Sequence, residues 1–235
     1  VLRHFSMKAV AALAIASMAA NYSATEIGIV SPPLLLTAIP FEMSDILTSL
    51  ALIGPLAAVV AIIFMKSMIY LGSLPPKLKL QSWQAPIIAG FACGLCGMIF
   101  SEILGLGTET LISVITNEQN IVYLLALLIG KLVLTSICIG FGFFGGTFSP
   151  ALFLGGVLGA IIFQLPMTSI NSDLLSVLAV SGMAAVSSSV IGAPITAIIL
   201  VLELTGSYEY AIAATFPIVI CSFITSRTFG NSLFD

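Results

Sequence analysis

Charged side chains are scarce in this chain of 235 residues. Lysine and arginine contribute 7 residues and aspartate and glutamate 10, so that charged residues make up 7% of the sequence. A soluble domain carries about 25% charged residues, and this composition therefore excludes an ordinary soluble protein. The net charge of −3 is small, and no basic stripe is present, so we expect no nucleic-acid partner.

Histidine is almost absent, and its shortage argues against the common catalytic sets. His4 is the only histidine, so the chain contains no HExxH helix and no serine–histidine pair at membrane depth. No paired aspartates, the other set expected of an intramembrane protease, are apparent. We therefore expect a protein that is not an enzyme and that needs neither a metal nor another cofactor.

Cysteines are few, and all four lie in apolar runs, where they do not form a disulfide framework. Cys93 and Cys96 form a C-x-x-C pattern, which is compatible with redox chemistry or with half of a zinc site. Their surroundings, GFACGLCG, consist of small residues that let membrane helices approach closely. We interpret the pair as packing residues, because no second cysteine pair completes a metal site.

Apolar residues dominate instead, at 59% of the sequence and a mean hydropathy of +1.20. They gather in eight segments, residues 5–20, 46–71, 85–103, 121–139, 151–165, 174–185, 193–205 and 211–225. The chain begins with Val1 and lacks the charged, apolar, small-residue order of a signal peptide. We therefore expect it to be a piece of a longer protein.

Several of these segments are shorter than the roughly 20 residues that a simple membrane span needs. Starts marked by glycine or proline recur at residues 31–33, 75–76, 142–150 and 192–194. Helices that end inside the membrane are tolerated only where they are buried in protein or line a polar cavity. The sequence thus predicts an all-α, polytopic membrane protein with short, tilted and broken helices, and it favours a transporter or channel.

The run GFGFFGGTFSP, residues 140–150, is the most informative motif. Pro150 suits the first turn of a helix, because its ring fixes φ and it needs no N–H acceptor. The amides of Thr147 and Phe148 then lie just ahead of that helix, where free N–H groups and the helix dipole can hold an anion. The alternative is an ordinary helix start in which Ser149 is the cap.

This motif carries a family resemblance. GKLVLTSICIGFGFFGGTFSPALFLGGVLGA resembles the GxFxP region of the CLC family of chloride channels and proton-coupled chloride antiporters. SGMAAVSSSVIGAPITAIILVLELTGSYEY resembles the next helices of that family, and FGNSLFD resembles its short final segment. The resemblance is specific over residues 130–235 and looser over residues 5–20 and 83–103. It implies that residues 1–235 are the C-terminal inverted-repeat half of a CLC-type transmembrane domain.

The resemblance also implies which residues bind the anion. CLC proteins hold it on backbone amides of the GxFxP motif, here Thr147 and Phe148, with Gly146 and Pro150 shaping the loop. Many members add a hydroxyl from the final segment, but Phe234 occupies the matching position. Phenylalanine has no donor, so one hydrogen bond worth about 1.5 to 3 kcal/mol is lost.

The implied function is transport of chloride or a related small anion, such as bromide or nitrate. The gating and proton glutamates of the family belong to segments before Val1, so a channel and a proton-coupled antiporter both stay open. A fluoride-selective relative or an unrelated inverted-repeat transporter also fits. The implied partners are the lipid bilayer, the N-terminal half of the same protein, and a second copy in a homodimer formed through residues 5–20, 193–205 and 211–225. The implied location is the inner (plasma) membrane of a prokaryote.

Four polar features have plainer interpretations. For Glu203 we favour a structural or capping role at a helix end over a proton relay, and we expect Lys131 to extend to the membrane surface. Residues 187–189, three serines, either line a vestibule or let helices pack. Glu102 and Glu109 are expected to be solvated loop groups.

Overall fold

All regular elements in the described part of the chain are helices, which confirms the predicted all-α fold. The computed structural model describes residues 7–28, 43–81, 83–117, 119–165, 174–230 and 233. In chain order the elements are α1 (Met7–Glu26), α2 (Met43–Gly72), α3 (Leu74–Lys77), α4 (Gln84–Ile99), the 3-10 helix η1 (Ser101–Ile103), α5 (Thr108–Thr116), α6 (Ile121–Gly140), α7 (Phe148–Phe163), α8 (Leu174–Ile191), α9 (Pro194–Thr205) and α10 (Tyr208–Thr228).

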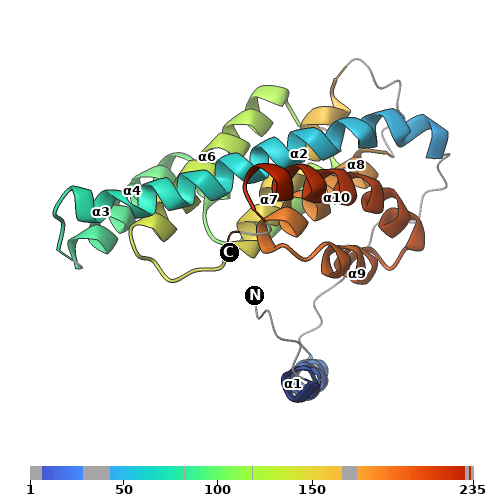
Figure 1. Cartoon of the computed structure of the whole chain (residues 1–235), viewed down its shortest axis with the longest axis horizontal. Helices are drawn as coiled ribbons and strands as arrows, with labels where there is room; N and C mark the ends of the chain where they lie inside the picture. The colour runs from blue at the N-terminus through green and yellow to red at the C-terminus, as the bar shows by residue number, and fades with distance from the viewer. Residues whose placement is uncertain are drawn as a thin grey trace.

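Helix α8 forms the centre of the molecule. Every residue from Leu174 to Val190 is buried, because α8 is apolar or small on all sides and can be enclosed by protein. Helices α2, α7, α9 and α10 pack around it (Figure 1). The apolar segment was predicted to end at residue 185, whereas the helix continues through the serines at 187–189 to Ile191.

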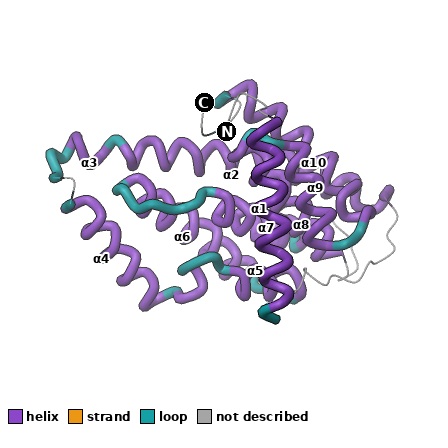
Figure 2. The backbone as a smooth tube through the Cα atoms, turned by 90° about the horizontal axis from the view of Figure 1, so that it is seen from below, coloured by secondary structure: helices purple, strands orange, loops and turns teal. Residues whose placement is uncertain are grey.

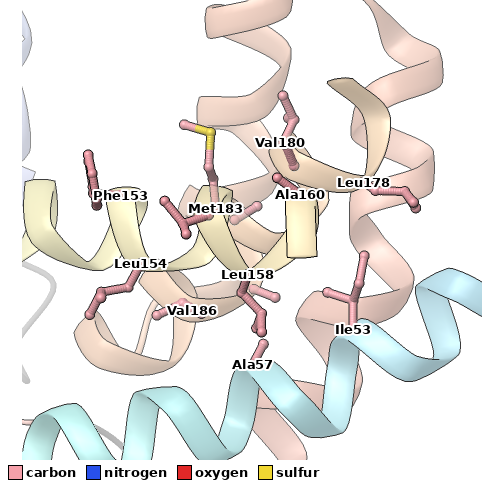
Figure 3. Packing of buried hydrophobic residues seen from close by; sticks show 14 of the residues in the cluster. Ile53, Ala57, Phe153, Leu154, Leu158, Ala160, Leu178, Val180, Met183 and Val186 are labelled. Carbon is pink, nitrogen blue, oxygen red and sulfur yellow. The ribbon is translucent and has the colours of Figure 1, made fainter. Parts of the chain in front are cut away.

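Helices α7 and α8 pack backbone against backbone. A Cβ atom added to Gly155 would overlap the carbonyl group of Gly182, and one added to Gly159 would overlap the carbonyl oxygen of Leu178. Glycines at i and i+4 are the small residues that let two membrane helices approach closely. On its other side α7 packs against α2, and Figure 3 shows Leu158 of α7 directed toward Ala57 of α2.

Helix α2 runs along the length of the body with α10 beside it (Figure 1). Its 30 residues span about 45 Å at 1.5 Å per residue. This exceeds the roughly 30 Å of membrane hydrocarbon, so α2 is long enough to cross a membrane even when tilted. Gly54 allows the close contact with α10, because an added Cβ would overlap the side chain of Ile220.

The lengths of the helices confirm the mixture of long and short spans. Among the described residues, four stretches are long and apolar enough to cross a membrane: Ile46–Lys77, Ile121–Gly140, Leu174–Ile191 and Tyr208–Thr228. Three apolar helices, α4, α7 and α9, are shorter than a full span. Short helix α5 was not predicted from the sequence, since only nine residues form it.

Two parts of the chain extend from this body. Helices α3 and α4 lie at one end of it, as both views show (Figures 1 and 2). Helix α1 stands apart from the other helices (Figure 1). Its side chains from Ala11 onward are exposed, apart from that of Ala24, although most are apolar. Helix α1 therefore presents apolar surface on every side to lipid or to protein outside this chain.

Candidate anion site

The glycine-rich motif forms a bend between α6 and α7. Helix α6 ends at Gly140 and α7 begins at Phe148, two residues before Pro150. Gly142 adopts φ +97°, a conformation that L side chains rarely tolerate and that glycine reaches freely. Gly146 was also predicted to shape this bend. Gly146 does not have a positive φ, and an added Cβ would meet open space there.

The first turn of α7 keeps its N–H groups available. Thr147 is the N-cap residue, but its side chain makes no capping hydrogen bond. Ser149 lies inside the helix, and its hydroxyl donates to the carbonyl oxygen of Leu106 at 3.4 Å. The alternative with Ser149 as the cap is therefore wrong. The N–H groups of Phe148 and Ser149 have no acceptor within the helix, and Pro150 has no N–H.

The loop ahead of α7 is open to the outside of this chain, whereas the helix behind it is enclosed. Phe144 is fully exposed, and Phe143 and Phe148 are 38% and 37% exposed. From Pro150 to Ala160 every residue but Leu152 is buried. The positive end of the α7 dipole is therefore presented at the surface, surrounded by uncovered phenylalanines.

A cavity of about 200 Å³ lies beside the loop. It is open on one side and is lined by parts of α4, the turn after η1, α6 and the bend itself. Its lining residues are Cys93, Ile103, Leu104, Gly105, Lys131, Leu134, Thr135, Cys138, Ile139, Phe143, Phe144, Gly145, Gly146 and Pro150. The cavity therefore brings one cationic side chain and two thiols to the same place as the glycines of the anion motif.

Lys131 is a buried cation in this cavity. Its side chain is 2% exposed, and its Nζ donates to the carbonyl oxygens of Ile103 at 2.8 Å and Gly105 at 2.7 Å. Nζ also lies 5.0 Å from the ring centroid of Phe153 in α7. The prediction that Lys131 extends to the membrane surface is wrong. None of these three partners carries a charge, so they leave the positive charge of Lys131 uncompensated.

The serines of α8 act mainly as packing and hydrogen-bonding residues. Ser188 shares a hydrogen bond of 3.3 Å with Ser222 of α10, and Ser189 shares one of 3.0 Å with Cys221. Ser187 and Ser188 also line a cavity of about 40 Å³ beside Phe148. These contacts support helix packing, one of the two interpretations of the serines. The small cavity, which bears on the other interpretation, lies next to the first residue of α7.

The carboxylates considered earlier lie at the surface. Glu203 is exposed in the last turn of α9. Its negative charge stands at the unfavourable end of that helix dipole, so it is no dipole cap. Glu102 and Glu109 are exposed around η1 and α5, as expected. Within the described residues no group of three or more His, Cys, Asp or Glu could hold a metal ion.

Phe234 lies outside the described residues, so its predicted place beside the anion stays a prediction. The residue before it, Leu233, is described. Its backbone N–H donates to the carbonyl oxygen of Val190 at 3.2 Å, and its side chain packs against the hydrophobic core. This contact brings Leu233 to the C-terminal end of α8, where Ile191 lines the small cavity beside Phe148.

Residues 1–227 match the family model described as voltage-gated chloride channel. The chain belongs to this family. It is therefore an integral membrane protein, as its apolar helices also indicate, and its resemblance to CLC proteins is confirmed.

Curated relatives extend the comparison. The H(+)/Cl(-) exchange transporter ClcA of Vibrio parahaemolyticus is 35% identical over 126 residues, which is 52% of this chain and 26% of the relative. ClcA of Klebsiella pneumoniae is 32% identical over 124 residues, again 52% of this chain and 26% of the relative. The matched part thus spans about a quarter of the length of these relatives.

Two solved structures share the fold. A CLC-type fluoride/proton antiporter superposes with a TM-score of 0.78 at 23% identity, over 97% of this chain and 56% of that one. A slow cyanobacterial Cl-/H+ antiporter superposes with a TM-score of 0.69 at 20% identity, over 87% of this chain and 49% of that one. At these identities the likeness establishes the fold, and it places this chain on about half of each structure.

Three features of the site were missed from the sequence. The positive φ of Gly142 had a weak signal, since four glycines stand within the motif. Lys131 had a stronger one, because it is the only charged residue in the apolar segment 121–140. The proximity of Cys93 to Cys138 had none, because these residues lie on helices separated by more than twenty residues of intervening chain.

Proposed function

We propose that this chain is the C-terminal half of a CLC-type protein that carries chloride or a similar small anion across the membrane, as a channel or as a proton-coupled antiporter. The observation that carries the proposal is the uncapped start of α7. Thr147 makes no capping bond, and the hydroxyl of Ser149 is directed to Leu106. Backbone donors at this helix end can therefore receive an anion in place of a side chain.

The proposed anion ligands are the backbone amides of Thr147 and Phe148, with Gly146 and Pro150 beside them. A site built from backbone amides binds a dehydrated anion through partial charges, which hold it weakly enough for release. The helix dipole contributes the equivalent of about half a positive charge at its N-terminus. Phe234 is the proposed neighbour from the final segment, and it supplies an aromatic edge in place of a hydroxyl donor.

The missing half of the ion path is proposed to come from the N-terminal half of the same protein. Phe144 is fully exposed in this chain, next to backbone that must be shielded from lipid. Irregular backbone at membrane depth is stable only when protein or an aqueous cavity covers it. The short coverage of the relatives, 26% of their length, agrees with a chain that represents one part of a larger transport unit.

A homodimer in the inner membrane of a prokaryote completes the proposal. Helices α9 and α10 expose large apolar side chains, among them Ile195, Ile199, Ile212, Val219 and Phe223. These helices and α1 are the ones that the family resemblance assigns to the dimer interface. The bacterial origin of the relatives supports the location, and their description as transporters supports a role other than catalysis.

Flux measurements on the full-length protein in liposomes test this function. The vesicles are loaded with chloride, and efflux and internal pH are recorded together. We expect chloride efflux, with opposite proton movement if the protein is an antiporter and none if it is a channel. Thr147→Ala is the matched variant, since it removes a side chain but keeps the amide, and it should retain most of the flux. Loss of flux in this variant would mean that the hydroxyl, not the backbone, is the ligand.

Fluoride is the alternative substrate, since one solved structure with this fold is a fluoride/proton antiporter. The same vesicles loaded with fluoride separate the two possibilities. Flux of fluoride without flux of chloride would replace the proposed substrate, and flux of neither anion would contradict the proposal as a whole.

A further inference from the structure

Two thiols from different helices meet in the cavity beside the anion motif. Cys93 of α4 and Cys138 of α6 both line it, and the two thiols lie close enough to influence each other electrostatically. Both side chains are half-buried, and both thiols are free. Cys96, the C-x-x-C partner of Cys93, is exposed and is not among the residues that line the cavity.

The same cavity holds the buried ammonium group of Lys131. Cys93 lies close enough to Lys131 for a charge on the sulfur to interact with the ammonium group. The partners of Nζ are two carbonyl oxygens and an aromatic ring, which are neutral. A negative charge on the sulfur pair would therefore gain a compensating cation without any movement of the helices.

Two thiols beside a buried ammonium group favour a particular class of ligand. Thiolates are soft ligands that prefer Cu⁺ over hard cations such as Mg²⁺ or Ca²⁺. Structural Zn²⁺ needs four protein ligands, and no group of three or more suitable side chains lies together among the described residues. Cu⁺ accepts as few as two sulfur ligands, so a pair of thiols is sufficient for it.

We propose that Cys93 and Cys138 form a binding site for a soft monovalent metal ion, Cu⁺, in the cavity between α4, α6 and the bend of the anion motif. Binding converts two thiols and Cu⁺ into a bis-thiolate complex with one negative charge and releases two protons to solvent. No electron is transferred. Lys131 offsets the charge of the complex, so the occupied site is neutral overall, as burial at membrane depth requires.

Occupancy of this site has a consequence for the proposed transport. Gly145 and Gly146 form another wall of the cavity, and the bend between α6 and α7 turns at Gly142. A metal ion that joins α4 to α6 restrains this bend, and the charge of Lys131 is then offset locally. We therefore expect bound Cu⁺ to inhibit anion flux, a consequence that rests on the proposed function.

Direct binding tests the site independently of transport. The purified full-length protein is titrated with Cu⁺ under anaerobic, reducing conditions against a chromophoric Cu⁺ chelator, in buffer that contains gluconate instead of chloride. We expect each chain to remove one Cu⁺ from the chelator. Cys93→Ser and Cys138→Ser should each abolish this competition. Cys221→Ser is the matched control, since Cys221 of α10 is buried against Ser189 of α8. This variant should compete for Cu⁺ as the parent does.

Two further variants distinguish this site from its alternatives. Cys96→Ser should leave the competition unchanged, whereas its loss would assign the metal to the C-x-x-C pair. Lys131→Met should weaken Cu⁺ binding by about tenfold, the lower end of the effect of outer-shell substitutions at metal sites. Thermal unfolding of each variant verifies that it is folded. Full competition by the Cys93→Ser, Cys138→Ser double variant, or no competition by the folded parent, would overturn the proposal.

Flux assays then address the inhibition. Cu⁺ should reduce anion efflux of the parent and leave the Cys138→Ser variant unaffected. Binding without inhibition would retain the metal site and reject its effect on transport. Binding in a protein without any anion flux would retain the site and reject the proposed function, so the two failures can be distinguished.

Discussion

At the scale of single residues, Lys131 is the most unusual group of the chain. A buried ammonium ion in a membrane helix loses its hydration, and two carbonyl oxygens restore only part of it. Lys131 lies in the cavity that also contains Gly145 and Gly146, so the free energy lost on burying its charge can be offset by a contribution to the proposed anion binding. A fixed positive charge close to a neutral amide site raises the local concentration of anions.

Two substitutions separate the effect of the Lys131 charge on anion binding from the effect of its hydrogen bonds. Lys131→Gln keeps an N–H donor for Ile103 or Gly105 but is neutral, whereas Lys131→Arg keeps the charge. For an anion about 10 Å away in an effective dielectric of about 20, the lost attraction is about 1.7 kcal/mol. We expect the glutamine variant of the full-length protein to bind chloride up to roughly twentyfold more weakly by calorimetry. Arginine should restore the affinity; equal affinities in all three proteins would assign Lys131 to structure alone.

Gly142 and Gly146 offer a matched pair in the bend. Gly142→Ala forces a side chain onto φ +97°, which should cost about 1 to 2 kcal/mol of stability. Gly146→Ala places a Cβ in open space at an ordinary φ, so its effect on stability should be small. Thermal unfolding of the full-length protein in detergent measures both. A larger loss at Gly146 than at Gly142 would contradict this description of the bend.

Phe234 tests the proposed contribution of the final segment. Phe234→Tyr adds one hydroxyl donor, which should strengthen chloride binding by no more than about 1.5 to 3 kcal/mol. Calorimetry of chloride binding to the parent and variant provides the comparison. Unchanged or weaker affinity in the tyrosine variant would mean that Phe234 does not face the ion.

At the scale of helices, the pairing of α7 with α8 positions the anion motif. Backbone contact along Gly155, Gly159 and Gly182 fixes α7 at its buried side, while its N-terminus stays open. An amphipathic face did not select this arrangement, because both helices are apolar or small on all sides. Shape decides the pairing, since within a membrane close packing replaces the hydrophobic effect as the driving force.

Substitution of these glycines should therefore separate the helices. We expect Gly155→Ala to destabilise the full-length protein by about 1 to 3 kcal/mol, as overpacking does, because backbone atoms of α8 occupy the space. Gly94→Ala in α4 is the control, since nothing lies within 4 Å of its added Cβ and alanine favours a helix. Melting curves in detergent compare the two variants. A melting temperature of Gly155→Ala equal to that of Gly94→Ala would be inconsistent with direct backbone contact.

At the scale of the whole molecule, many large apolar side chains are exposed. Helix α1 stands apart (Figure 1), and the loop before α7 exposes Phe144 completely. In a bilayer, lipid can cover apolar side chains, but it cannot satisfy irregular backbone. At membrane depth the open loop therefore requires protein or an aqueous cavity against it, which agrees with the proposed N-terminal half.

This requirement predicts the behaviour of the chain in isolation. Residues 1–235 alone, reconstituted into liposomes, should give no specific anion flux, because the half of the ion path that we propose to lie in the N-terminal half is then absent. The full-length protein, prepared and reconstituted in the same way, is the positive control. Robust chloride flux from residues 1–235 alone would show that they contain a complete path and that the half-protein proposal is wrong.

Much of this architecture could be predicted from local pattern. The eight apolar segments predicted eight of the helices to within a few residues at most ends, because a membrane helix needs only its own residues to satisfy its backbone hydrogen bonds. Gly and Pro marked real boundaries: α9 begins at Pro194 and ends before Gly206, whose φ is +64°. The motif at residues 140–150 also predicted a helix start with available amides, and α7 begins inside it.

Only the tertiary structure decided what surrounds that helix start. Lys131 was expected at the membrane surface and is instead buried against Ile103, Gly105 and Phe153. Cys93 was interpreted together with Cys96 as a packing residue, and the fold places it in one cavity with Cys138 of another helix. The physical reason is the same in both cases: composition and spacing determine which segments leave water for the membrane, whereas burial of a single side chain depends on which distant helix packs beside it.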